Sequence, residues 1–209
     1  MTASPASPST TSRAKWRSGL VTGVLVLLTL SLGMFVDQRL PDPASVREAP
    51  FIREVSRNAS VNLRTGQVSV VNLNASPTLR GQQVVAVSKE GTFLVLDLEF
   101  RARNQPGTLS HLTLQATDGR TFGGLPPTGS DGCGPAQPGI PVRCQVVFEV
   151  DRPALAGLKL RVPSDNVSSG QGDVVALIDL SIDPAQAQRL NAQKAPLDVS
   201  SVAQVQERP

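Results

Sequence analysis

The feature that most constrains this chain is an apolar run near its N-terminus, Leu20 to Val36, which contains no charged residue. With Gly19 the run forms a segment at 19–36, and as a helix this segment rises about 27 Å, close to the thickness of a bilayer's hydrocarbon core. Segments of this length and composition are typical of membrane spans. We therefore expect one transmembrane helix over 19–36.

The flanks of this segment predict its orientation. Arg13, Lys15 and Arg17 directly precede it, and basic residues favour the cytoplasmic side. Residues 1–18 are then a disordered basic cytoplasmic tail, and everything after the helix is extracytoplasmic at the cell membrane. No pair of small residues typical of a signal-peptide cleavage site follows, so we expect an uncleaved signal-anchor, with cleavage after Val36 as the alternative.

Charge outside this segment argues against nucleic-acid binding. The formal net charge is +3 and the pI is about 9.3. Three of the 20 basic residues precede the apolar run and all 17 acidic residues follow it, so the remainder carries 17 charges of each sign. A neutral exported part offers no phosphate-binding surface. An Arg to Lys ratio of four to one and the absence of Tyr suggest a GC-rich source such as an actinobacterium.

The two cysteines, Cys133 and Cys144, lie close together beyond the predicted helix. In an oxidising compartment such a pair indicates a disulfide, because a metal site would need further ligands and the chain contains one histidine, His111. We expect a disulfide and neither a metal nor a cofactor.

Small residues within the apolar run bear on self-association. Gly19 and Gly23 have the GxxxG spacing that lets two membrane helices approach closely. A weak homodimer through this helix and a tilted monomer are the two outcomes that the spacing leaves open.

The segments that flank the predicted domain differ from it in composition. Residues 37–58 contain Pro41, Pro43 and Pro50 among charged residues, which predicts an extended stalk. Residues 184–209 are rich in Gln and Ala. A short helix from Ala185 to Lys194 would have a thin apolar face, so a flexible tail is the prediction for 184–209.

Residues 59–183 have the pattern of β-strands. The strongest alternation runs from Thr92 to Arg103, where apolar residues occupy one parity and charged residues the other. In the segment QVSVVNLNA the apolar parity changes, which predicts a β-bulge near Val70. Further short strands are expected at His111–Thr117, Val146–Val150, Leu158–Val162 and Val174–Ile182.

Turn signals separate these strands. Asp118-Gly119 predicts a tight hairpin, and a Pro- and Gly-rich loop from Gly123 to Val142 carries both cysteines. Many short strands with such spacing indicate one all-β domain, an antiparallel β-sandwich.

The run TFLVLDLEFRARN, then LTLQATDGRTF, then PG followed by VVFEVDRP and LKLRV, resembles a known family. It is similar to the Ig-like extracellular domains of unknown function in membrane-anchored proteins and lipoproteins of Gram-positive bacteria, including secreted immunoprotective proteins of actinobacteria. The resemblance implies an Ig-like sandwich over 59–183 and no catalytic residues. The chain lacks the lipid-accepting cysteine of lipoproteins, and its cysteine loop is not a constant of the family.

Candidate catalytic residues are few. Ser110 and His111 adjoin at the predicted start of a strand, where neighbours face opposite sides, so they do not form a dyad. Asp97 and Glu99 share one strand face, and a solvated face explains them better than a glycosidase pair. The sequence contains no GxSxG, HExxH or P-loop motif. We therefore do not expect an enzyme.

Three functional hypotheses follow. The first is a non-enzymatic, single-pass envelope protein that presents its Ig-like domain for protein or envelope binding. In this hypothesis the Gly124 to Pro138 part of the loop is either the contact surface or a connection that the disulfide merely holds in place. The second is an accessory subunit of a secretion or wall-assembly complex that interacts through its transmembrane helix. The third, which the sequence favours least, is a hydrolase with an unrecognised site.

Overall fold

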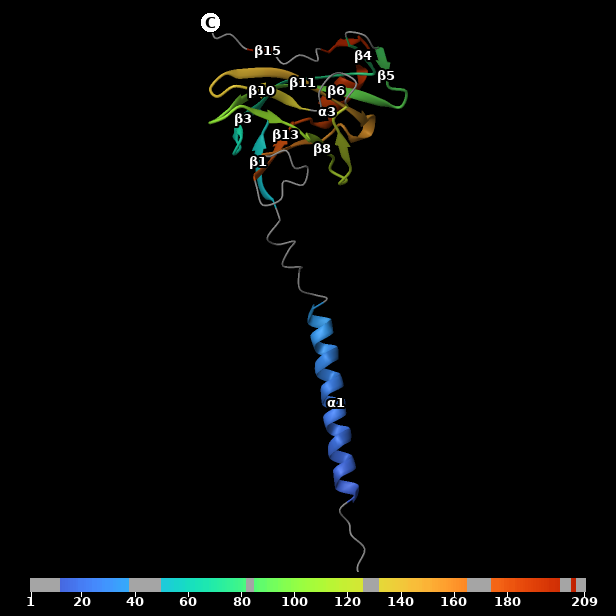
Figure 1. Ribbon diagram of the computed structural model, residues 1–209. Helices are drawn as coiled ribbons and strands as arrows, with labels where there is room; N and C mark the ends of the chain where they lie inside the picture. The colour runs from blue at the N-terminus through green and yellow to red at the C-terminus, as the bar shows by residue number, and fades with distance from the viewer. Residues whose placement is uncertain are drawn as a thin grey trace, which may run out of the picture. The chain divides into compact units, whose positions relative to one another are not determined.

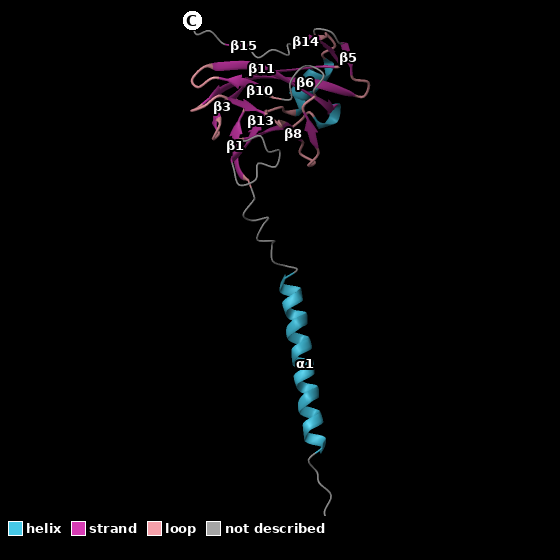
Figure 2. Ribbon diagram, viewed as in Figure 1, coloured by secondary structure: helices cyan, strands magenta, loops and turns pink. Residues whose placement is uncertain are grey.

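The computed structural model describes residues 12–37, 50–81, 85–125, 132–164, 174–199 and 204–205. The chain divides into two units, Met1–Arg47 and Glu48–Pro209, and each is considered by itself. The first contains one helix and the second consists mostly of strands (Figures 1 and 2).

The helix of the first unit, α1, extends from Ser12 to Asp37. Its side chains are described for residues 23–35, and all of these are exposed. Among the residues described, no helix combines the length and the apolar character that a membrane crossing requires. The membrane-spanning helix over 19–36 therefore stays a prediction.

The second unit is a β-sandwich built on two five-stranded sheets. The β1 sheet has the strand order β1-β13-β12-β8-β9, and the β6 sheet has the order β15-β11-β6-β3-β2. Their inner faces enclose the main core, to which Leu96, Phe100 and Phe148 contribute from the β6 sheet and Leu160 and Ile178 from the β1 sheet. The predicted sandwich is confirmed.

The strands and helices of this unit have the following bounds: β1 Phe51–Ser56, β2 Val61–Asn62, β3 Gly66–Ser76, β4 Thr78–Arg80, β5 Val85–Val87, β6 Gly91–Ala102, β7 Gly107–Leu109, β8 Thr113–Gln115, β9 Thr121–Gly123, β10 Cys133–Ala136, β11 Pro141–Asp151, the 3₁₀ helix η2 Arg152–Ala154, β12 Lys159–Pro163, β13 Val174–Asp179, α3 Pro184–Ala192, β14 Leu197–Asp198 and β15 Gln204–Val205.

The central strand β6 confirms the alternation expected from Thr92 to Arg103. Leu94, Leu96, Leu98 and Phe100 are fully buried in the main core. The opposite face is also buried at the start of the strand, where Phe93 joins a second apolar cluster. The three-stranded sheet β14-β4-β5 contributes Leu79 to this cluster. The first half of β6 is therefore buried on both faces, which alternation alone does not predict.

Strand β3 contains the predicted bulge. The register with β6 shifts between Val70, which pairs with Leu98, and Asn72, which pairs with Asp97. Val71 is the extra residue and is exposed. The bulge lets Val70 and Leu73, which have opposite parity, both enter the core.

The start of the domain differs from the prediction, because the stalk does not extend over the whole of 37–58. β1 begins at Phe51 and pairs with β13 along six registered positions, Phe51 with Val174 to Ser56 with Asp179. This pairing is parallel, as is that of β14 with β4, so the purely antiparallel sandwich was also wrong. Apolar and polar residues do not alternate in β1, because most side chains of this edge strand are exposed to solvent.

The predicted tail at 184–209 is wrong over its first half. The Asp183 side chain accepts a hydrogen bond from the Gln186 backbone N–H at 2.6 Å and caps α3, with Pro184 at the start of the helix. Ala187 and Leu190, one turn apart, are buried in the main core. A contact face of two residues is enough here because the sheets already enclose the rest of that core.

Candidate functional site

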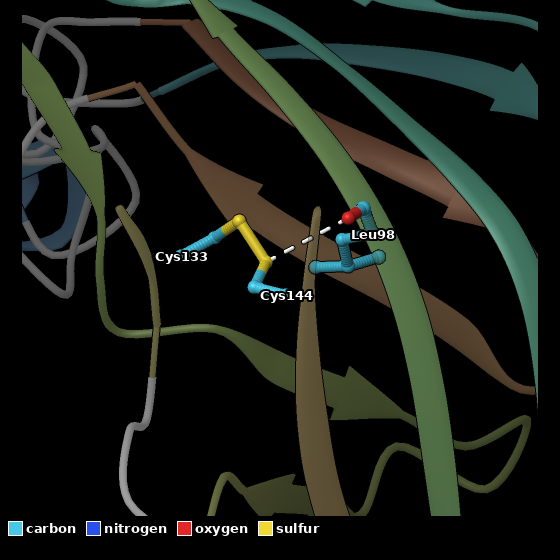
Figure 3. Close-up of a disulfide and its surroundings, with 3 residues drawn as sticks. All are labelled: Leu98, Cys133 and Cys144. Carbon is cyan, nitrogen blue, oxygen red and sulfur yellow. Dashed lines mark hydrogen bonds between the residues drawn. A yellow bond between two sulfur atoms is a disulfide. The ribbon is translucent and has the colours of Figure 1, made fainter. Parts of the chain in front are cut away.

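The disulfide between Cys133 and Cys144 is present, with the two Cα atoms 5.5 Å apart (Figure 3). Cys133 is 1% exposed and Cys144 is 6% exposed, and both belong to the main core. The Cys144 Sγ lies 3.7 Å from the carbonyl oxygen of Leu98 on β6. We regard this as a packing contact, because a disulfide sulfur has no proton to donate.

The predicted loop from Gly123 to Val142 is in part regular structure. β10 begins at Cys133 and pairs with β7, where Cys133 lies opposite Leu109. A Cβ added to Gly132 would collide with the Leu109 carbonyl oxygen, so the chain next to the disulfide is tightly packed. These features support the interpretation of the disulfide as a staple. Residues 126–131, in the middle of the predicted contact surface, lie outside the described residues.

His111 does not begin a strand, so the alternating-face argument for Ser110 and His111 was wrong in its premise. β8 starts at Thr113, and His111 has a φ of 55°. This left-handed conformation, which histidine adopts more readily than most residues, interrupts the extended backbone. The imidazole is exposed on the connection from β7 to β8.

Asp97 and Glu99 lie on the outer face of β6, as expected. Gln145 Nε2 donates a hydrogen bond to Asp97 Oδ1 at 2.9 Å, and Arg143 Nε lies 3.8 Å from Glu99 Oε2. Both carboxylates therefore have cross-strand partners on β11, an arrangement typical of a solvated strand face.

Arg120 clamps the hairpin between β8 and β9. Its Nε lies 2.7 Å from Asp118 Oδ2, and its Nη1 contacts Asp151 Oδ2. Hydrogen bonds from the backbone and side chain of Arg120 lower the pKa of Asp118 below its ordinary value. Gly119 has a φ of 86°, as the predicted tight turn requires. These contacts fix a turn and enclose no site.

A hollow lies on the outer face of the β1 sheet. It consists of two adjoining recesses of about 260 and 350 Å³, both lined by Glu54, Lys159 and Leu177. We call it the Glu54 hollow. Its remaining lining residues come from β1, β8, β13 and nearby turns: Val55, Ser56, Gln115, Ala116, Thr117, Gly157 and Asp179.

Strand register explains why these side chains meet. Lys159 pairs with Asp179 on β13 and with Gln115 on β8, so the three side chains share one face. Leu177 on the same face pairs with Glu54 of β1. The neighbouring positions Leu160 and Ile178 point into the main core, so this shared face is the outer one.

The Glu54 hollow combines an apolar floor with polar walls. Leu177, 9% exposed, forms the floor. Lys159 Nζ lies 3.3 Å from Glu54 Oε1, with both side chains partly exposed. Gly157 has a φ of 73°, and a Cβ there would approach Thr117 Cγ2 to 2.6 Å, so glycine lets the chain pass close to Thr117 at one side of the hollow. The hollow offers carboxylate, ammonium, amide and hydroxyl groups to a polar ligand.

Metal binding has no support in the described ranges, where no three His, Cys, Asp or Glu residues are grouped to hold an ion. The sequence reasoning missed the Glu54 hollow because Glu54 fell in the predicted stalk. The one signal in the sequence was Lys159 and Arg161 alternating with the apolar residues of β12.

The structure does not test the roles predicted for residues of α1, which are to set the membrane orientation and to pack against a second helix. Arg13, Lys15, Arg17 and Gly19 lie in the helix, but their side chains are outside the described set. Within the described part of α1, a Cβ added to Gly23 would meet no side chain of the helix within 4 Å. Helix packing through Gly19 and Gly23 stays a prediction.

A scan against protein-family models and a search of curated proteins found no match. Solved structures similar to the chain include a protein of unknown function from Listeria monocytogenes EGD-e, with 13% identity, a TM-score of 0.42, and coverage of 60% of this chain and 83% of that one. An uncharacterized β-sandwich protein from Clostridium difficile 630 has 7% identity and a TM-score of 0.41, with 67% and 99% covered.

A third similar structure is a protein described as a candidate lipoprotein from Bacillus subtilis, with 15% identity and a TM-score of 0.42. The match covers 63% of this chain and 41% of the Bacillus protein. Likenesses at this level carry no argument about function. The resemblance to the Ig-like family of Gram-positive bacteria stays a prediction.

Proposed function

We propose that this protein is a non-enzymatic, single-pass envelope protein that presents an Ig-like sandwich outside the membrane and binds a polar ligand or protein partner there. The uncharged segment at 19–36 and the basic residues before it support the anchor and its orientation. The buried disulfide supports an oxidising compartment for the domain.

The observation that carries the binding role is the Glu54 hollow. It joins four strands on a sheet face, with an apolar floor and side chains of both charges around it. Recesses with an apolar base and a few polar groups are the usual form of binding sites.

Site-specific photocrosslinking in intact cells tests this proposal. A photoreactive residue replaces the exposed Thr117 at the rim of the Glu54 hollow, and a second variant carries it at the exposed Lys89 in the turn between β5 and β6. We expect a discrete adduct from position 117 and none from position 89. Lys159→Ala in the first variant should remove the adduct, while the matched Lys89→Ala should leave it.

The same experiment distinguishes the cysteine loop from the Glu54 hollow. A photoreactive residue at the exposed Gln137, next to β10, reports on the loop. Adducts from position 137 without adducts from position 117 would move the contact surface to the loop and overturn the hollow as the site.

Compartment and anchoring have their own test. With the full chain expressed in cells and then denatured so that the buried cysteines become accessible, Cys133 and Cys144 should resist alkylation until a reductant is added. After removal of 1–36 they should react directly, because the chain then stays in a reducing cytoplasm. Thiols that alkylate freely in the full chain would contradict export.

The GxxxG spacing of Gly19 and Gly23 supports the helix-mediated alternative. Replacing Leu20 to Val36 by an unrelated apolar helix of equal length separates it from the first proposal. Adducts from position 117 should survive the replacement if the sandwich binds, and should disappear if the helix carries the interaction.

A further inference from the structure

Four arginines lie at one end of the β6 sheet. Arg101 is near the end of β6, Arg103 directly follows that strand, Arg143 is near the start of β11, and Arg64 lies in the turn between β2 and β3. Arg101 is half-buried and the other three are exposed. We call this set the arginine cluster.

Strand register brings these residues together. Arg143 pairs with Glu99, two residues before Arg101, so Arg143 and Arg101 are diagonal neighbours on the outer face, about 7 to 8 Å apart. Arg103 has the same parity as Arg101. The Arg103 backbone N–H donates to the Thr65 carbonyl oxygen at 3.1 Å, so the β2–β3 turn lies next to Arg103.

The arginine cluster has a surplus of positive charge. In the segments that form it, 61–69, 99–103 and 141–143, Glu99 is the single carboxylate. Its Oε2 lies 3.8 Å from Arg143 Nε, whereas no carboxylate in the described ranges pairs with Arg101 or Arg103. A net charge of zero after the apolar run does not exclude such a surface, because the fold can concentrate charges of one sign.

The chemistry of arginine indicates the kind of ligand. A guanidinium group presents paired N–H donors that match the oxygens of a phosphate group. Because strand geometry separates Arg101 from its neighbours by about 7 Å, each guanidinium contacts a separate anionic group. A small anion therefore meets one arginine, and a linear polymer with a charge in each repeat meets several.

A lipid surface fits this end of the sheet less well than a polymer does. Attachment to a bilayer uses apolar side chains that enter the headgroup region beside the basic ones. Among the described residues next to the arginine cluster, Ile140 is the large hydrophobic side chain that is exposed.

We propose that the arginine cluster binds a linear polyanion with phosphate groups in its repeats, across the ends of β3, β6 and β11. The cluster lies on a different sheet from the Glu54 hollow. This inference therefore goes beyond the proposed function and does not depend on it.

Binding of inorganic polyphosphate to the detergent-solubilised full chain tests the proposal. Every protein compared carries Arg13→Gln, Lys15→Gln and Arg17→Gln, so that this basic segment does not bind the probe. Arg101→Gln together with Arg103→Gln should weaken binding about tenfold or more at low salt. The same pair should reduce the slope of log affinity against log salt by about two, because two phosphate contacts are lost.

A matched pair of substitutions controls for net charge. Arg80→Gln together with Arg189→Gln removes two exposed charges elsewhere in the domain and should change the affinity less than about twofold. Equal weakening by both pairs would overturn the proposal. Binding to vesicles of anionic phospholipid without binding to polyphosphate would also overturn it. Retention of the Cys133–Cys144 disulfide and of the β-sheet circular dichroism shows that each variant is folded.

Glu99→Gln gives a test with the opposite sign. It removes the carboxylate of the arginine cluster and releases Arg143, so the affinity for polyphosphate should rise about twofold to fivefold. Glu90→Gln, at an exposed position between β5 and β6, is the matched control and should leave the affinity unchanged. An unchanged or lower affinity in Glu99→Gln would place the polymer elsewhere and overturn the proposed site.

Discussion

Strand β6 carries apolar clusters on both of its faces, and the two differ in how they are enclosed. On the inner face, Phe100 belongs to the main core between the two large sheets, and Leu190 of α3 belongs to the same core. On the outer face, Phe93 is covered by the small sheet β14-β4-β5 and by Val199. The inner cluster draws on residues from Val61 to Leu190, whereas five buried residues form the outer one.

The burial of a residue therefore does not show how much of the fold must open to expose it. Phe93 and Phe100 are both almost inaccessible to water. The cover over Phe93 consists of short strands and one extended segment, and we expect it to detach while the two large sheets remain paired. The inner cluster cannot open without separating those sheets.

Phe100→Ala should have the largest effect. The side chain is fully buried, and the close packing of Gly66 and Gly107 against its ring shows that the site cannot collapse freely. We expect a loss of about 4 to 5 kcal/mol in the free energy of unfolding, at the upper end for such truncations. Chemical denaturation followed by circular dichroism measures it, and a cost below that of Phe93→Ala would contradict the comparison.

Phe93→Ala makes the same substitution on the same strand and serves as the matched variant. Its cover can adjust, so we expect a smaller loss of about 3 kcal/mol. Hydrogen exchange should show faster opening of β4 and β5 while β11 stays protected. Uniform acceleration across both large sheets would indicate that the two clusters unfold as one unit.

Removing the disulfide with Cys133→Ala and Cys144→Ala should cost about 3 kcal/mol or somewhat less, because the closed loop is short. The bond links β10 to β11 at the inner cluster, so β7 and β10 should lose exchange protection first. Reduction of the unmodified chain should reproduce the same loss. A much greater loss in the double variant than on reduction would point to cavities rather than to the crosslink.

The outer cover also depends on one buried hydroxyl. Ser76 Oγ donates to the Ala195 carbonyl oxygen at 2.8 Å and accepts from the Thr78 backbone N–H at 3.0 Å. Ser76→Ala leaves both partners unsatisfied and should cost about 1 to 2 kcal/mol. Ser69→Ala, on the same strand at a half-buried position, is the control and should have little effect. Equal losses of stability from Ser76→Ala and Ser69→Ala would show that the two hydrogen bonds of Ser76 add nothing specific to the fold.

The smallest effect concerns the exposed clamp at the β8–β9 turn. Hydrogen bonds from Arg120 lower the pKa of Asp118, so the carboxylate stabilises the fold above its ordinary pKa of 3.8. This contribution is lost as the pH falls through the lowered pKa of the folded state. Asp118→Asn should therefore melt slightly below the unmodified chain at neutral pH and match it in strong acid. A difference in melting temperature that grows on acidification would contradict a stabilising role for the Asp118 carboxylate.

The sequence predicts the features that depend on a local pattern. It does not predict the elements whose structure depends on contacts with distant parts of the chain. The alternation of β6, the bulge at Val70, the Asp118-Gly119 turn and the disulfide all leave a signature within a few residues. β1 leaves none, because an edge strand next to solvent has no buried parity.

The Glu54 hollow is beyond local pattern for a related reason. Glu54, Gln115, Lys159 and Asp179 come from four strands, and only the register between those strands brings them to one face. The helix α3 is a similar case, since it contributes only Ala187 and Leu190 to a core that other elements build. No sequence window contains the partners that give these residues their roles.

The bulge in β3 also has a consequence for how this domain tolerates changes in length. Deleting Val71 would place Asn72 directly after Val70, so that Val68, Val70, Leu73 and Ala75 would fall on one parity and keep their present inward direction. The partners of these residues on β6 would not change. We therefore expect the domain to tolerate the loss of this one residue from a central strand without moving its core, a tolerance more typical of surface loops.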